Sequence, residues 1–105
     1  MQQAHQRHLE VTMEKDIERR LVRAVRCEGG WAIKLASPGT AGLPDRLILF
    51  PEGIAGFIEL KAPGCKPSPL QMAQISRLKR LGFPVIVLDD SEQIGQTIDV
   101  LRHAA

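Results

Sequence analysis

The chain has 105 residues, with 14 basic and 12 acidic side chains and a formal net charge of +2 at pH 7. That length allows one domain with one hydrophobic core and excludes a second. The composition is ordinary for a globular protein, and no apolar stretch is long enough to predict a membrane span. The polar start of the chain also lacks the apolar segment of a signal peptide, so we expect a cytoplasmic protein.

The two cysteines, Cys27 and Cys65, are not spaced like a metal-binding pair. In a chain without export signals we expect them to be free thiols. A disulfide between them is the alternative.

The first helix is predicted over residues 12–27. Residues 1–11 are polar and rich in Gln and His, and we predict that they form a tail preceding a single domain over residues 12–105. Thr12 can cap the helix, and apolar side chains repeat along it at helical spacing. Acidic residues in its first turns and arginines in its last turns suit the helix dipole.

Three strands are predicted next, over residues 31–36, 46–50 and 55–61. Apolar side chains alternate with other residues in the first, and the second is a short apolar run. The Pro-Glu-Gly turn at residues 51–53 predicts that the second and third strands form a hairpin.

A second helix is predicted over residues 69–81. Ser68 can cap it, Pro69 suits its first position, and Gln71 can complete a capping box. A glycine at position 82 ends it.

The end of the chain predicts a very apolar strand over residues 84–88, central in a sheet or flanked by helices, and a last helix from residue 90 or 91 to about 102. The element order is α-β-β-β-α-β-α. The hairpin requires antiparallel pairing, and the strand–helix–strand passage requires a parallel neighbour. We therefore predict an α/β fold with a mixed sheet flanked by helices.

Three residues can carry chemistry at the hairpin. Glu59 and Lys61 are two apart, so they share one face of a strand, and Asp45 enters the strand that pairs beside them. Two carboxylates with a backbone carbonyl and waters can hold Mg²⁺ or Mn²⁺, which activates water and neutralises a phosphodiester. Lys61 would orient that water or stabilise the charge that develops on phosphorus. The pattern predicts a metal-dependent nuclease; a strand-entry cap and a surface ion pair are the structural alternatives.

Four motifs in this order resemble the VRR-NUC nucleases of the PD-(D/E)XK superfamily, which have the restriction-endonuclease-like fold. They are a glutamate in the first helix, GLPD at residues 42–45, ELK at residues 59–61 and SPLQ at residues 68–71. The resemblance covers nearly all of residues 13–98.

The resemblance implies a role for each matching residue. Asp45 and Glu59 would bind the metal, with the backbone carbonyl of Leu60 completing the inner shell. Lys61 would be the catalytic lysine, and Gln71 would lie beside the site.

The glutamate of the first helix has two candidates. Glu14 and Glu18 lie one turn apart on the same side of the predicted helix. Glu14 matches the family's E-x-x-I pattern with Ile17, and the distance of Glu18 from Gly29 suits related resolvases. We favour Glu14 and keep Glu18 as the alternative.

The resemblance implies a DNA endonuclease that hydrolyses phosphodiester bonds with Mg²⁺ or Mn²⁺. It would be structure-selective, like a Holliday-junction resolvase or a flap nuclease of DNA repair, and would work as a homodimer in the cytoplasm of a bacterium or a virus-infected cell. A catalytically silent DNA-binding module of the same fold is the alternative. Four basic residues could contact the DNA backbone: Lys34, Arg46, Lys66 and Arg77.

Overall fold

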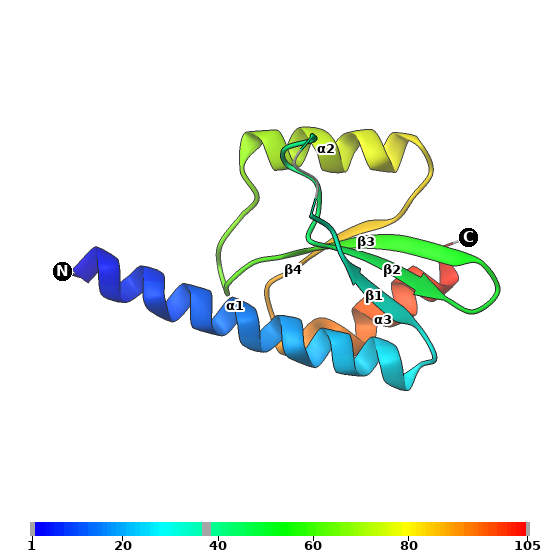
Figure 1. The fold of residues 1–105 in the computed structure, drawn as a ribbon, viewed down its shortest axis with the longest axis horizontal. Coiled ribbons are helices and arrows are strands. Elements are labelled where there is room, and N and C mark those ends of the chain that lie inside the picture. Colours follow the sequence, from blue (N-terminus) through cyan, green and yellow to red (C-terminus); the bar gives the residue numbers. More distant parts are fainter. Residues whose placement is uncertain (1, 37–38, 105) are drawn as a thin grey trace.

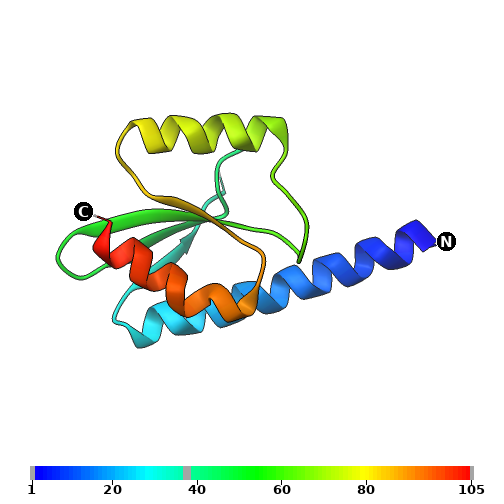
Figure 2. The same ribbon diagram turned by 180° about the vertical axis from the view of Figure 1, so that it is seen from behind.

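The structure, a computed structural model, describes residues 2–36 and 39–104. The elements are α1 (Gln2–Cys27), β1 (Trp31–Lys34), β2 (Arg46–Phe50), β3 (Ile54–Leu60), α2 (Pro69–Arg80), β4 (Val85–Leu88), a 3₁₀ turn η1 (Ser91–Gln93) and α3 (Ile94–His103). The predicted order and the α/β fold with a mixed sheet are confirmed. The sheet lies between α2 on one face and α1 with α3 on the other (Figure 1), as the view from behind also shows (Figure 2).

The four strands follow the order β1-β2-β3-β4 in the sheet. β1 with β2 and β2 with β3 pair antiparallel, whereas β3 and β4 pair parallel. The predicted hairpin is confirmed, with Phe50 opposite Ile54 across the turn. β4 is an edge strand flanked by α2 and α3, so the expectation of a central strand is wrong and that of a strand flanked by helices is confirmed.

The main core lies between the sheet and the α1–α3 layer. Ile58 and Leu60 of β3 point into it. Because side chains alternate along a strand, the other face of β3 is turned toward α2. The remaining buried members are Ile17, Leu21, Val25, Ile48, Phe50, Leu88, Ile94, Ile98 and Leu101. Alternation along β3 therefore directs Phe57, Glu59 and Lys61 to the α2 face.

α1 begins at Gln2, ten residues before the predicted start. Residues 3–9 are exposed, so this segment lacks the apolar stripe that marked residues 12–27. It is rich in residues that favour helices, such as Ala, Gln, Arg and Leu. Thr12 is inside the helix and its hydroxyl donates to the carbonyl of His8 at 2.9 Å, so the predicted cap at Thr12 is wrong.

α2 begins as predicted. Ser68 caps the helix, its side chain accepts from the backbone N–H of Gln71, and Pro69 occupies the first turn. The Gln71 side chain accepts in return from the backbone N–H of Ser68 at 2.9 Å, which completes the capping box. The start of α2 is thereby fixed at the end of the loop that follows β3.

Both cysteines are free thiols, as predicted, with Cys27 exposed and Cys65 half-buried. Within residues 2–36 and 39–104, no helix has the length and apolar character needed to cross a membrane.

Candidate active site

The predicted site residues meet where β3 ends and β2 begins. Asp45 directly precedes β2, and one of its carboxylate oxygens accepts from the backbone N–H of Leu60 at 2.8 Å. The backbone carbonyl of Asp45 accepts from Leu35 at 2.9 Å. Asp45 is thus held on both sides, between the end of β1 and the end of β3.

Pro44 explains why the Asp45 carboxylate replaces a normal sheet contact. The pairing of Arg46 with Ile58 sets Pro44 opposite Leu60 when it is continued by two residues. Proline has no N–H, so Pro44 cannot donate to the Leu60 carbonyl. Since the N–H and C=O of a strand residue point to the same side, that carbonyl is directed toward the Asp45 side of the strand.

Gly42 brings the GLPD segment against α2. Its φ is +84°, and a Cβ at this position would lie 2.8 Å from Cγ of Leu70. The side chain of Gln74 also donates to the carbonyl of Ala41 at 3.1 Å. Only glycine allows both the backbone conformation and the close approach, so this residue positions Asp45 indirectly through its contact with α2.

Glu59 is the most unusual side chain of the site, because it is a carboxylate with 1% of its surface exposed. Its Oε2 accepts from Nζ of Lys61 at 2.8 Å and from Nε2 of Gln71 at 2.7 Å. Its Oε1 is buried and has no hydrogen-bond partner among the described residues. Leaving a charged acceptor buried without a partner is costly, so this oxygen marks a place where a further group would bind.

Gln71 both completes the capping box and contacts Glu59. Its Oε1 completes the capping box with Ser68, while its Nε2 donates to Glu59. The two ends of one amide therefore tie the start of α2 to the carboxylate of β3. We call Asp45, Glu59, Lys61 and Gln71 the carboxylate cluster.

The carboxylate cluster holds more negative than positive charge. Burial raises the pKa of Glu59; the hydrogen bond from Lys61 opposes this rise, and the neighbouring Asp45 carboxylate adds to it. One lysine faces two carboxylates, so a cation beside them would relieve their repulsion.

The two helix glutamates differ in their neighbours. Burial raises the pKa of Glu14, the charge of Asp45 raises it further, and the charge of Lys61 lowers it. Glu18 instead accepts from Nη2 of Arg46 at 3.0 Å and from its Nε at 3.3 Å. Glu14 therefore faces the carboxylate cluster, while Glu18 is engaged by an arginine.

The four predicted DNA-contacting residues have different surroundings. Arg46 is only 15% exposed, and besides Glu18 it donates to the carbonyl of Ala32, so it holds β2 to α1 and β1. Lys34, Lys66 and Arg77 are exposed, on β1, the loop after β3 and α2 respectively. The structure thus leaves three of the four available for a partner, while Arg46 is half-buried and engaged by Glu18 and Ala32.

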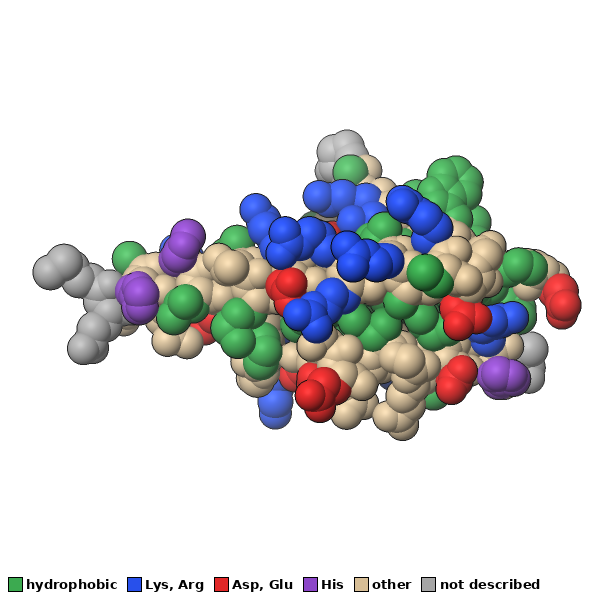
Figure 3. Space-filling view, turned by 90° about the horizontal axis from the view of Figure 1, so that it is seen from below, with side chains coloured by type: hydrophobic (Ala, Val, Ile, Leu, Met, Phe, Trp, Pro, Cys, Tyr) green, Lys and Arg blue, Asp and Glu red, His purple; other side chains and the backbone are tan. Residues whose placement is uncertain are grey.

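The sequence alone assigns the arginines of α1 no role beyond suiting the dipole of the predicted helix. In the structure, Lys and Arg side chains gather along α1 when the molecule is seen from below (Figure 3). The exposed arginines of α1 are Arg7 near its start and Arg19, Arg20, Arg23 and Arg26 in its second half. Asp16 pairs with two of them, so part of this charge is compensated within the helix.

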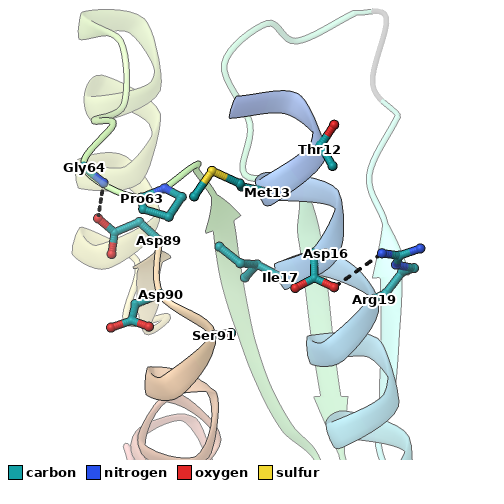
Figure 4. A pocket seen from close by; sticks show the side chains of 10 residues that line it. All are labelled: Thr12, Met13, Asp16, Ile17, Arg19, Pro63, Gly64, Asp89, Asp90 and Ser91. Carbon is teal, nitrogen blue, oxygen red and sulfur yellow. Dashed lines mark hydrogen bonds and ion pairs between the residues drawn. The ribbon is translucent and has the colours of Figure 1, made fainter. Parts of the chain in front are cut away.

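A cavity of about 710 Å³ lies between α1 and two loops, and it is separate from the carboxylate cluster. Its lining includes Met13 and Ile17 of α1, Pro63 of the loop after β3, and Asp89, whose carboxylate accepts from Gly64 (Figure 4). It shares no residue with the carboxylate cluster, so its volume does not identify the reactive site.

Within the part of the chain that the structure describes, no group of three or more His, Cys, Asp or Glu side chains is arranged to hold a metal ion. The acidic donors at the carboxylate cluster are Asp45 and Glu59. Mg²⁺ is commonly held by one or two carboxylates with the remaining positions filled by other oxygens. The unpartnered Oε1 of Glu59 and the Leu60 carbonyl are oxygens of this kind, so the residues present fit Mg²⁺ or Mn²⁺.

Comparisons with known proteins point to one family. Residues 2–91 match the sequence model of the VRR-NUC domain. The chain is 51% identical over 79 residues to a protein named "Putative nuclease p44" from Acyrthosiphon pisum secondary endosymbiont phage 1, a match that covers 75% of this chain and 85% of that protein. A solved structure titled "VRR_NUC domain" superposes with a TM-score of 0.78 at 28% identity, covering 83% of this chain and 95% of that one. The chain therefore belongs to the VRR-NUC family of nucleases.

Proposed function

We propose that the chain is a Mg²⁺- or Mn²⁺-dependent DNA endonuclease that prefers branched substrates. The observation that carries the proposal is Glu59, a buried carboxylate beside Asp45 with one oxygen left without a partner. A structural ion pair would satisfy both oxygens, whereas a metal-binding carboxylate keeps one directed at its ion. Family membership and the phage relative named a nuclease support the reaction class.

Asp45, Glu59 and the Leu60 carbonyl would hold the ion. When bound, it would neutralise charge on the phosphodiester and lower the pKa of a coordinated water. Asp45 is pre-positioned by the hydrogen bond from Leu60, and Glu59 by those from Lys61 and Gln71. Side chains held in place before substrate binds need no reorganisation during reaction.

Lys61 would act on the phosphate side of the reaction. Its ammonium is held 2.8 Å from Glu59 and its side chain is 18% exposed, so it is fixed yet still reachable by a ligand. There it can orient the attacking water or stabilise the charge developing on phosphorus. Glu14 faces the same space from α1 and, with its raised pKa, can accept or donate a proton near the reacting groups.

A homodimer would suit a branched substrate. Two copies related by a two-fold axis present two equivalent sites, and a four-way junction offers two equivalent strands. Light scattering in solution should give twice the mass of the 11.6 kDa chain. A strictly monomeric protein would remove this part of the proposal.

The cleavage test uses Glu59→Gln with Glu92→Gln as its matched control. Both remove one carboxylate, but Glu92 is exposed and lies outside the carboxylate cluster. Labelled four-way junctions, flaps and plain duplexes are incubated with Mg²⁺ or Mn²⁺. We expect the wild type and Glu92→Gln to cut branched DNA faster than duplex, and Glu59→Gln to lose about 1000-fold in rate, because several kcal/mol of charge stabilisation depend on the ion.

The same experiment decides between this proposal and a silent DNA-binding module. If the wild type binds the substrates yet leaves all of them intact with either metal, the chain is such a module. If Glu59→Gln cuts as fast as the wild type while keeping its helical circular dichroism spectrum, the assignment of Glu59 is wrong.

A further inference from the structure

A small pocket adjoins the carboxylate cluster on the side of the N-terminal part of α1. Its volume is about 260 Å³. α1 supplies Arg7, Val11 and Glu14 to one wall, and the segment after β3 supplies Lys61 and Lys66 to the other. Lys61 belongs to both the pocket and the carboxylate cluster, so the two adjoin.

The wall from α1 exists because the helix begins at Gln2. Residues 7, 11 and 14 are four and three positions apart, so they lie on one face of the helix. Arg7 is about 10 Å along the helix axis from Glu14, at about 1.5 Å per residue. One DNA strand rises about 3.4 Å per nucleotide, so this distance spans about three nucleotides.

The opposite wall is a loop held in place at several points. The backbone N–H of Cys65 donates to the carbonyl of Ala62 at 3.0 Å, and Gly64 donates to the Asp89 carboxylate at 3.4 Å. Lys66 therefore extends from a loop with defined geometry next to Lys61.

Lys61 is paired with Glu59, but the pocket's other two basic side chains, Arg7 and Lys66, are not neutralised by ion pairs within the described residues. Within residues 2–36 and 39–104, neither Arg7 nor Lys66 forms one, and both side chains are exposed. Glu10, the pocket's other acidic residue besides Glu14, accepts from the side chain of Gln6 at 3.2 Å. Two exposed cations on facing walls are suited to a phosphate, which accepts hydrogen bonds from both arginine and lysine.

We propose that Arg7 and Lys66 bind a backbone phosphate of the DNA strand that enters the carboxylate cluster. The proposal rests on the proposed function, because that function makes a DNA strand the ligand of the adjoining cluster. The phosphate would lie within about three nucleotides of the one that is cut, given the spacing along α1. The N-terminal turns of α1 would thus be part of the substrate-binding surface, and Arg7 and Lys66 would be positioning residues.

The test compares two double variants that each remove two positive charges. Arg7→Ala with Lys66→Ala changes the pocket, and Arg23→Ala with Arg26→Ala changes two exposed arginines further along α1. Binding of labelled four-way junction DNA is measured by fluorescence anisotropy in EDTA, without cleavage, over a range of salt concentrations. Circular dichroism confirms that each variant is folded.

We expect the pocket variant to bind at least about 10-fold more weakly. The slope of log K against log salt should become smaller by about one, since each phosphate that the protein no longer neutralises lowers it by about one. The control variant should keep a slope close to that of the wild type. The charge-conserving exchange of Arg7→Lys with Lys66→Arg should restore most of the affinity.

Equal effects of the two double variants, or no effect of either, would overturn the phosphate site while leaving the nuclease proposal intact, provided that the wild type cuts DNA with Mn²⁺. A wild-type protein that neither binds nor cuts any of the substrates would overturn both proposals together.

Discussion

The carboxylate cluster and the Glu18–Arg46 pair both remove acidic side chains from water, and Arg46 directly follows Asp45 in the chain. In the pair, one arginine contacts one glutamate through two nitrogens. In the cluster, one lysine pairs with Glu59 while Asp45 adds a second carboxylate, and a buried oxygen of Glu59 has no partner among the described residues. The contrast teaches that burial alone does not distinguish a structural acid from a functional one. The balance of charge around it does.

The most direct test of this difference is to neutralise the two helix glutamates separately. Glu14→Gln should reduce the cleavage rate by about 10- to 100-fold, as expected for removal of a proton-transfer group, with little change in the free energy of unfolding. Glu18→Gln should instead lower the free energy of unfolding by about 1–3 kcal/mol, because it leaves the half-buried Arg46 without its anion. Urea unfolding and cleavage rates below the unfolding transition measure the two effects. The reverse pattern would assign Glu18 to the site.

The stabilisation of the folded protein by a bound metal ion should depend on the carboxylate cluster and not on the Glu18–Arg46 pair. At a free Mn²⁺ concentration ten times Kd, binding stabilises the folded state by about 1.4 kcal/mol, which is several degrees in Tm for a chain of this size. Glu18→Gln should show the same metal-induced shift as the wild type, from a lower starting Tm. Glu59→Gln and Asp45→Asn should show almost none. A shift that survives both changes would mean that the ion binds elsewhere.

The smallest expected effect is on pH dependence in the metal-free protein. The pKa of Glu59 is raised in the folded state, primarily by burial, so the folded state holds this proton more tightly than the unfolded chain. The stabilisation is present below the ordinary pKa of 4.5 and is lost as the pH rises through the higher folded pKa. The wild type should therefore lose stability relative to Glu59→Gln as the pH rises through that window. Urea unfolding in EDTA at several pH values measures the difference, and a constant difference would contradict the burial of a charged Glu59.

The sequence predicts the fold well because its signals are local. The hairpin turn, the capping box of Ser68 and Gln71, and the alternation around Glu59 each specify one feature, and the structure confirms each. The prediction for the start of α1 is wrong for the opposite reason. Its first turns carry no apolar stripe, so no periodic pattern distinguishes a helix that extends beyond the core from a polar tail.

The surroundings of the site residues could be predicted only in part. Spacing within one strand places Glu59 and Lys61 together, and the hairpin brings Asp45 beside them. The choice between Glu14 and Glu18 depends on where Arg46 directs its guanidinium, which is a contact between residues 28 positions apart. The pocket of Arg7 and Lys66 depends on the unexpected extension of α1. Nothing in the polar sequence around Arg7 indicates that its side chain will line a pocket.

The shared amide of Gln71 has a consequence for the dynamics of the site. α2 has one buried side chain, Ile75, and exposes Leu70 and Met72, so little apolar burial opposes its local opening. When α2 opens, Glu59 loses a hydrogen-bond donor in the same event that undoes the capping box. Hydrogen exchange at the first amides of α2 would therefore report how often the carboxylate cluster is assembled, because the side-chain amide of Gln71 belongs to both the capping box and the contact with Glu59.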